Sequence, residues 1–538
     1  MISPPPSRLD RAAALVIVLG AITVVLAVVA YKAFELDRFF VPKELVLHVT
    51  AAVAALLVLE RLPRAPLGIV DLLLGGYLLL SLVSALLADN HWVAARGFAI
   101  SVSGILLFWT ARTLARTGLG RRIVTGVSVA VVLGALTALA QAYGVVSGAL
   151  SEYLSLARAP GGTFGNRNFM AHLAAIGTPA LVYLAISTRR RIGALAAVLG
   201  LVVIAAAVVL SRSRAAWLAL LATGALLALG AMWRWRVIGP SAARRALLLG
   251  TAVAASVAGA LFLPNALEWK SDSPYLDSVT GVVNYRSGSG RGRLIQYRNS
   301  TRLALREPLL GVGPGNWAVE YPRVASSNDP SLTADGMTAN PWPSSDWAAF
   351  LSERGIPAFV LLVAAFGGTL LMAALRLRDA HRPEEALEAL ALAGTVTTTM
   401  TVGAFDAVLL LAAPSLVAWT LIGALGATVA PLSRWTPALE AGRRRVAMVA
   451  IAALGLLFTL RSASQLGGMA VFQSSRGYRG LDRAALVDPG SYRIRVRAAE
   501  SALANGNCRQ ARRHAEAARS LFPRAYAARR VLRRCGRG

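Results

Sequence analysis

The chain has 538 residues, 56% of them hydrophobic, and a formal net charge of +29. Soluble globular proteins contain about 45–50% apolar residues. Here the excess forms long runs, so the composition excludes an ordinary soluble domain and indicates an integral membrane protein. Most basic residues stand in short loops between these runs, where they orient the chain and meet lipid headgroups. We therefore expect membrane lipids as partners and no nucleic acid.

Thirteen apolar segments are predicted to cross the bilayer, each needing about 20 residues of helix. The first follows Arg8 and Arg11 without a convincing cleavage site, so we expect a retained helix rather than a removed signal peptide. The fold class is predicted as an all-α polytopic membrane domain over residues 1–464. The predicted spans are 12–31, 45–60, 67–88, 95–111, 123–143, 169–187, 193–210, 213–232, 246–263, 346–375, 388–410, 414–430 and 446–461.

The distribution of arginine predicts the orientation. Alternate short loops, counted from the N-terminus, hold most of the short-loop arginines. Positive charge resists translocation, so these loops are expected in the cytoplasm. The long polar gap at 264–344, between the ninth and tenth spans, then lies outside the cytoplasm, and so does the C-terminus.

A glycine-rich stretch precedes the sixth span. Residues 161–169 read Gly-Gly-Thr-Phe-Gly-Asn-Arg-Asn-Phe. Glycines let a backbone approach a ligand closely, and the N-terminus of the following helix favours an anion. Asn166, Arg167 and Asn168 are therefore candidate ligands for phosphate or sugar oxygens. The alternative is an ordinary loop with an asparagine helix cap.

Two arginines interrupt the next pair of spans, in the sequence Ser211-Arg212-Ser213-Arg214. An arginine at a membrane boundary is costly unless it reaches water or meets an anion. Its planar guanidinium suits phosphate. Arg212 and Arg214 are thus candidate phosphate ligands, and an interfacial turn with snorkelling arginines is the alternative.

The long gap contains a predicted basic helix at about 291–306. Four of its arginines follow each other at spacings of seven, four and four, which places them on one stripe. Leu294, Tyr297, Thr301 and Leu305 fall on another side, so the helix could lie on the membrane surface. The alternative is a solvated stripe. The stripe consists of Arg291, Arg298, Arg302 and Arg306.

A carboxylate begins the tenth span, where Asp346 stands between Trp342 and Trp347. Desolvation there could make it an acid/base group. The tryptophans could equally be interfacial anchors, and Asp346 a first-turn helix acid. The five histidines show no ligand spacing and no phosphate-binding loop motif occurs, so we expect neither a metal site nor ATP, and no cofactor.

The segment 465–538 is predicted as a small helical tail. Helices are expected at 491–504, 508–521 and 523–535, with alanines of the second on one face. The pattern is typical of a tetratricopeptide-type hairpin, although a plain helical tail fits too. Such a hairpin is too small to stand alone, so it should dock on the membrane domain. If the last two helices pack antiparallel, Cys508 and Cys535 are neighbours, which predicts a disulfide outside the cytoplasm. Two unpaired thiols are the alternative.

The order of these features resembles the O-antigen ligase and O-antigen polymerase family. The resemblance covers roughly residues 12–430. It lies in Val41-Pro-Lys43, in Gly162-Thr-Phe-Gly-Asn-x-Asn168-Phe, in Ser213-Arg214 and Gly292-Arg293, in Pro308-Leu-Leu-Gly-Val-Gly-Pro-Gly-Asn316, and in Asp346-Trp and Glu353-x-Gly355.

The resemblance implies an inverting, metal-independent glycosyltransferase of the GT-C type in the bacterial inner membrane. Its donor would be an undecaprenyl-pyrophosphate-linked glycan, and its acceptor a hydroxyl on a glycan or lipid at the periplasmic face. Arg214 and Arg293 would hold the pyrophosphate, with Lys43 as a further substrate-binding candidate. Family ligases usually carry a histidine base before the span that follows the long loop. Here Ser344-Ser345-Asp346-Trp347 stands at that place, so Asp346 is the candidate base.

Two other functions remain open at this point. A flippase or transporter for a lipid-linked glycan would need charged or broken helices near the bilayer midplane. A non-catalytic partner of a cell-surface glycan assembly would fit the missing histidine and the repeat-like tail. The residues leave polymerase, ligase and protein glycosylation undistinguished, with a polymerase or related transferase favoured.

Overall fold

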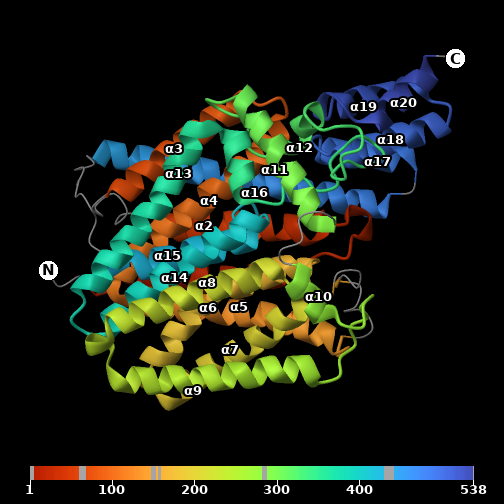
Figure 1. Ribbon diagram of the computed structural model, residues 1–538. Helices are drawn as coiled ribbons and strands as arrows, with labels where there is room; N and C mark the ends of the chain where they lie inside the picture. The colour runs from red at the N-terminus through yellow and green to blue at the C-terminus, as the bar shows by residue number, and fades with distance from the viewer. Residues whose placement is uncertain are drawn as a thin grey trace.

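The computed structural model describes residues 5–59, 68–146, 153–154, 159–281, 288–428, 441–475 and 477–536. In these ranges the protein is all-helical, as predicted, and its strand-like pairing is limited to one isolated bridge between Leu332 and Thr338. The long helices run side by side, and the segments after α9 and the C-terminal tail gather at one end of the bundle, on the right in Figure 1.

Each predicted span overlaps one long helix of the structure. The splits predicted at Ser211–Arg214 and near Phe405–Asp406 are both real helix breaks. Residue 60, residue 67 and residues 429–430, at the edges of three predicted spans, lie outside the described ranges. The helices are α1 Arg8–Leu26, α2 Asp37–Val58, α3 Ile69–Leu86, α4 His91–Leu114, α5 Gly120–Ala142, α6 Arg167–Ser187, α7 Arg191–Ser211, α8 Arg214–Trp233, α9 Trp235–Phe262, α13 Asp346–Asp379, α14 Pro383–Phe405, α15 Ala412–Leu425 and α16 Ala441–Ser474.

The number of membrane crossings stays a prediction. Within the described residues, ten helical stretches are long and apolar enough to cross a bilayer, one of which joins α4 and α5. The helix α15 has 14 residues and is shorter than a full crossing. The helix α14 is rich in threonine, and hydroxyls such as those of Thr395 and Thr398 donate to carbonyls four residues earlier at 2.8 Å. These bonds satisfy the hydroxyls and let α14 lie inside the bundle.

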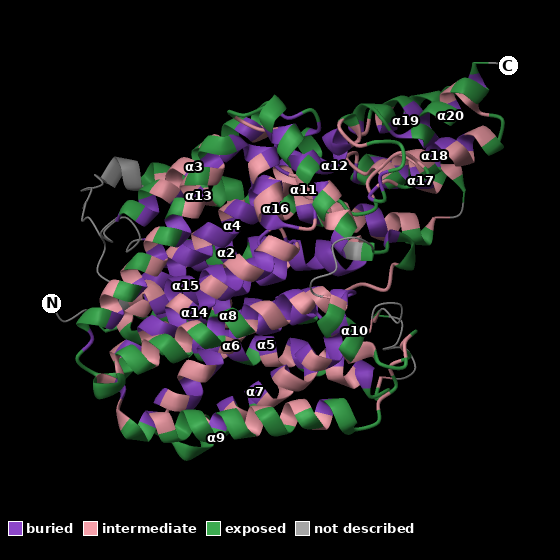
Figure 2. Ribbon diagram, viewed as in Figure 1, coloured by how far each residue is buried: buried purple, intermediate pink, exposed green. Residues whose placement is uncertain are grey.

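The core of the bundle is formed by α15 and α6, whereas α8, α9 and α16 line the outside. Every residue of α15 is buried, and so are 83% of the residues in the apolar window of α6. In the corresponding window of α9 only 11% are buried. Figure 2 shows this contrast between the purple interior helices and the green and pink surface of α9. Apolar side chains that face outward, such as Ile192 at 85% exposure, are expected on a lipid-facing surface.

In its described residues the gap at 264–344 holds three α-helices, α10 Pro274–Thr280, α11 Gly288–Arg306 and α12 Trp317–Glu320. The predicted basic helix exists as α11, but its packing differs from the expectation. Leu294 and Leu305 are exposed along with the arginine stripe, and the buried face is largely polar. It is tied down by hydrogen bonds: Asn299 donates to Asp329 at 3.0 Å, and Trp317 donates to Ser300 at 2.9 Å. The helix therefore packs on its own loop through polar contacts.

The tail contains α17 Tyr478–Val487, α18 Tyr492–Ala504, α19 Cys508–Leu521 and α20 Tyr526–Cys535. The sequence predicted the last three and missed α17. The predicted boundary at 464/465 falls inside α16, which continues to Ser474 because the chain remains helical after its apolar run ends. The alanines expected on one face of α19, Ala511, Ala515 and Ala518, are all fully buried. The tetratricopeptide likeness stays a prediction.

The tail docks on the membrane domain and its long loop. Asp335 of the loop accepts a hydrogen bond from the Tyr492 hydroxyl at 3.0 Å, and its carbonyl accepts one from the Tyr526 backbone at 2.9 Å. The Asn90 side chain, at the start of α4, donates to the Leu521 carbonyl at 2.9 Å. These bonds hold the tail at the same end of the bundle as α10 and α11.

Candidate functional site

The junction between α7 and α8 directs three successive side chains to three different elements. Arg212 has a φ of +54°, a left-handed conformation that turns the chain between the two helices. Its Nε donates to the Ser278 hydroxyl of α10 at 2.8 Å. Ser213 lies 3.3 Å from the ring of His172 on α6. Arg214 donates to the carbonyl of Gly281. The junction is thus fixed on α6 and on the segment after α9.

Arg167, at the start of α6, reaches the same place. Its guanidinium carbon lies 5.0 Å from the centre of the Trp269 ring, and that of Arg212 lies 4.6 Å from it. Contacts of this kind attract a cation to an aromatic ring. Trp269 therefore brings together Arg167 and Arg212, two of the predicted site residues.

Arg293 approaches the junction from α11. The residue is half-buried, and its charge is close enough to act on His172, whose ring also contacts Ser213. Arg293 thus lies near His172, the residue that Ser213, the chain neighbour of Arg214, also contacts. No carboxylate of the described residues pairs with either arginine. Arginines that are held without a carboxylate are suited to an anionic ligand.

Sequence reasoning missed His172, because the five histidines do not cluster along the chain. The side chain is buried, with its Nε2 3.3 Å from Ser213 Oγ and its Nδ1 without a hydrogen-bond partner. It follows the asparagine-rich stretch by one helical turn, so its nearness to Asn168 was the available signal.

The glycine-rich loop before α6 is a buried structural unit. The Asn166 side chain caps α6 by accepting from the Asn168 backbone at 2.9 Å. The Gly162 backbone donates to Gln141 of α5 at 2.8 Å. Lys43 is buried beside this loop, where its ammonium donates to the Ala27 carbonyl at 2.7 Å and lies over the Phe164 ring. Asn166, Asn168 and Lys43 therefore support the loop. Of the residues predicted in this stretch, Arg167 lies beside Arg212 at the α7–α8 junction.

The segment Pro308–Asn316 packs against a break in α13. Gly355 has a φ of +77° and interrupts the helix. Beside it, the backbone of Val312 donates to the Ser352 carbonyl at 3.0 Å, and that of Gly313 donates to the Glu353 carbonyl at 2.8 Å. A Cβ at Gly311 would lie 2.4 Å from the Glu353 carbonyl carbon, so the backbones approach too closely for a side chain. We call this contact between Pro308–Asn316 and Ser352–Gly355 the loop–helix joint.

The loop–helix joint also holds a buried ion pair. The side chains of Glu353 and Arg354 are 1% and 0% exposed and lie 3.0 Å apart. Arg354 donates further to Ser101 of α4 at 3.1 Å. Both charges are therefore paired inside the protein, which is how a fold accommodates buried charge.

A comparison with known protein families shows what this part of the chain is similar to. Residues 199–363 match the family model described as O-Antigen ligase. The chain carries the O-antigen ligase family domain. No curated protein sequence matches the chain. The family domain contains the α7–α8 junction, Arg293, the loop–helix joint and Asp346, whereas the glycine-rich loop precedes it. The predicted resemblance is thereby confirmed, and it indicates a glycan-transferring enzyme of the membrane.

Asp346 is the residue that the sequence resemblance suggested as the base. Its side chain is fully buried, and its two oxygens accept hydrogen bonds from the backbones of Val408 at 2.9 Å and Leu409 at 2.8 Å. These residues connect α14 to α15, so in this structure the carboxylate ties the start of α13 to that connection. Its catalytic role stays a prediction.

The remaining arginines of α11 face solvent. Arg291, Arg298 and Arg306 are exposed, and Arg302 lies 3.4 Å from the Asn299 side-chain oxygen. These residues stay substrate-binding candidates that the structure places outside the cluster formed by Arg212, Arg214 and Arg167. Among the described residues, no group of three or more histidine, cysteine or acidic side chains is arranged to hold a metal ion.

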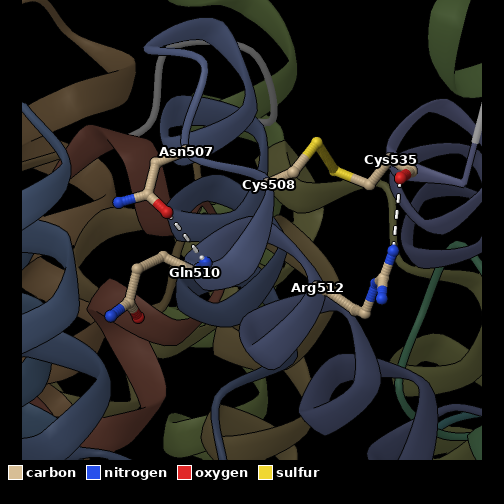
Figure 3. Close-up of a disulfide and its surroundings, with 5 residues drawn as sticks. All are labelled: Asn507, Cys508, Gln510, Arg512 and Cys535. Carbon is tan, nitrogen blue, oxygen red and sulfur yellow. Dashed lines mark hydrogen bonds between the residues drawn. A yellow bond between two sulfur atoms is a disulfide. The ribbon is translucent and has the colours of Figure 1, made fainter. Parts of the chain in front are cut away.

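The two cysteines of the tail form a disulfide. Their Cα atoms are 5.4 Å apart, and the bridge joins the start of α19 to the end of α20, as the antiparallel packing predicted. Figure 3 shows the bridge beside two further contacts of the same region, the Asn507 cap on the Gln510 backbone and the bond from Arg512 to the Cys535 carbonyl.

Proposed function

We propose that this protein transfers a glycan from undecaprenyl pyrophosphate to an acceptor hydroxyl at the periplasmic face of the bacterial inner membrane. One observation carries the proposal. Arg293 lies near His172, which Ser213, the chain neighbour of Arg214, also contacts, and neither arginine has a carboxylate partner among the described residues. A pyrophosphate is the anion that a lipid-linked glycan donor brings to such a pair.

The chemistry follows from the charge that develops on the donor. The acceptor oxygen attacks the anomeric carbon, the sugar–phosphate bond breaks, and both bonding electrons leave with the pyrophosphate. Arg214 and Arg293 stabilise this developing charge, which is the largest contribution that fixed donors make to group transfer. Attack from the face opposite the leaving group inverts the anomeric centre. Two arginines stabilise the charge without requiring a metal ion, so the transfer is proposed to be metal-independent.

A base must accept the proton of the attacking hydroxyl. Asp346 is the candidate by position, and it acts in this role once the bonds from Val408 and Leu409 release one of its oxygens. His172 is a second candidate because its Nδ1 lacks a partner. The variants Asp346→Asn and His172→Gln separate the two, since the variant that removes the base loses turnover while donor binding is kept.

The function is tested with the purified full-length protein in lipid nanodiscs and in vesicles. A radiolabelled undecaprenyl pyrophosphate glycan is supplied with and without an acceptor glycan. Transfer of label to the acceptor, or growth of the lipid-linked chain, supports the proposal and distinguishes ligation from polymerisation. Movement of the donor across vesicles without transfer would instead identify a flippase, and binding without turnover would identify a non-catalytic partner.

A further inference from the structure

Two polar groups beside Arg212 are enclosed without a partner. The Trp269 indole nitrogen and the Tyr275 hydroxyl are both shielded from solvent, and neither forms a hydrogen bond. Both belong to the segment after α9 that packs over the α7–α8 junction. More than nine-tenths of buried polar groups in native proteins are paired, so two unpaired groups beside one arginine need a physical explanation.

The rings of Trp269 and Tyr275 are held by packing, whereas the indole nitrogen and the phenol hydroxyl have no hydrogen-bond partner. Trp269 lies against the guanidinium groups of Arg212 and Arg167, at 4.6 and 5.0 Å. Tyr275 packs on Leu210 at the end of α7, together with residues of α5 and α9. The segment is further held by the bond between Arg212 and Ser278. A fixed ring with an unpaired polar end is a ready hydrogen-bonding position.

The chemistry of the two groups restricts their ligand. An indole nitrogen only donates, so it cannot bind a cation. Burial raises the pKa of Tyr275 and the phenol keeps its proton, so it can donate and accept. The ligand must therefore offer hydrogen-bond acceptors, and the hydroxyl groups of a sugar ring offer these together with a donor that the phenol oxygen can accept. An alkyl chain offers neither.

We propose that Trp269 and Tyr275 form a subsite for the sugar that is linked directly to the carrier pyrophosphate. The inference rests on the proposed function, because Arg214 and Arg293 would hold the pyrophosphate, and Arg212, two residues before Arg214, contacts the Trp269 ring. The indole donates to one sugar hydroxyl and the phenol exchanges a hydrogen bond with another. The subsite would thus distinguish a glycosylated carrier from the bare one.

The test compares two ligands on variants of the full chain in nanodiscs. Trp269→Phe and Tyr275→Phe each keep the ring and remove the polar group. Binding is measured for undecaprenyl pyrophosphate with one sugar attached and for bare undecaprenyl pyrophosphate. Each variant should bind the sugar-bearing carrier about 3- to 10-fold more weakly, the value of one hydrogen bond, and bind the bare carrier as wild type does.

The controls are Trp235→Phe and Tyr526→Phe, which make the same changes at residues that are 51% and 49% exposed and lie away from the junction. Melting temperatures establish that all four variants are folded. Equal weakening of both ligands, or no weakening of either, would overturn the subsite. If wild type transfers glycan but the variants show no difference between ligands, the subsite alone fails. If wild type binds neither ligand, the proposed function fails with it.

Discussion

The loop–helix joint and the α7–α8 junction both lie in the O-antigen ligase family domain, yet they differ in whether their charged side chains are paired. In the joint, Glu353 and Arg354 are fully buried and paired with each other at 3.0 Å. In the junction, Arg214 bonds to a backbone carbonyl and lacks a carboxylate among the described residues. One part of the family domain therefore holds paired charges inside the fold, and the other carries the arginines that we propose bind the donor pyrophosphate.

The largest loss of stability is expected when one charge of the loop–helix joint is removed. Glu353→Ala leaves Arg354 buried and unpaired, which should destabilise the fold by about 3–5 kcal/mol. Little folded protein should be recovered, as measured by fluorescence-detected size-exclusion chromatography. The exposed pair Arg378–Asp379 supplies the control, since Asp379→Asn should be recovered like wild type. Normal recovery of Glu353→Ala would contradict a scaffold role for the joint.

The junction should show the reverse pattern, with loss of activity and an unchanged fold. Arg214→Ala and Arg293→Ala should each reduce glycan transfer by about 10²–10³-fold, the value of one donor to a developing charge. Their melting temperatures should stay near that of wild type. Lysine should restore little activity because it lacks the planar guanidinium. Thr301→Ala, an exposed change on the same helix as Arg293, should transfer glycan normally.

The tail has a small core compared with that of the bundle, and a disulfide also holds it together. The bridge joins residues 27 positions apart, which in the chain-entropy model is worth about 3–4 kcal/mol to the tail. Cys508→Ser with Cys535→Ser should therefore make the tail more sensitive to protease while the membrane domain persists. A thiol assay on protein made in an oxidising compartment should find no free thiol. Two reactive thiols would contradict the pairing and the predicted periplasmic placement.

Asp346 also belongs to the family domain, and its hydrogen bonds to the backbone resemble the structural contacts of the loop–helix joint. Asp346→Asn replaces one accepting oxygen with a donor facing the backbone N–H groups of Val408 and Leu409, and should cost about 1–3 kcal/mol of stability. If Asp346 is also the base, turnover falls far more than the loss of folded protein explains. Turnover that follows the folded fraction leaves it a structural role only.

The sequence predicted the helices better than the contacts between them. Long apolar runs determine a membrane helix locally, so the thirteen segments and the break at Ser211–Arg214 could be read directly. The polar anchoring of α11 could not, because it depends on Asp329 and Trp317, which follow their partners on α11 by 30 and 17 residues and reach them only through folding. The burial of Lys43 was hidden for the same reason, since its partners lie at the end of α1.

The candidate site was predicted in part. Arginine's affinity for phosphate selected Arg212, Arg214 and Arg293 from sequence alone. Arg212 and Arg214 lie at the α7–α8 junction, and Arg293 lies near His172, which Ser213 of the junction contacts. His172 and Trp269 were not selected, because a single histidine or tryptophan in an apolar chain is more often a packing residue. Their significance is visible only from unpaired atoms beside the arginines.

The central claim is that Arg214 and Arg293 together hold the carrier pyrophosphate, and its most direct test is carrier binding to the two single variants and the double variant. Isothermal titration of nanodisc-embedded protein with undecaprenyl pyrophosphate measures the affinity without requiring turnover. The account predicts that each alanine variant binds at least about tenfold more weakly than wild type, and that the double variant loses less than the sum of both because the arginines share one ligand. Wild-type affinity in both single variants would contradict it.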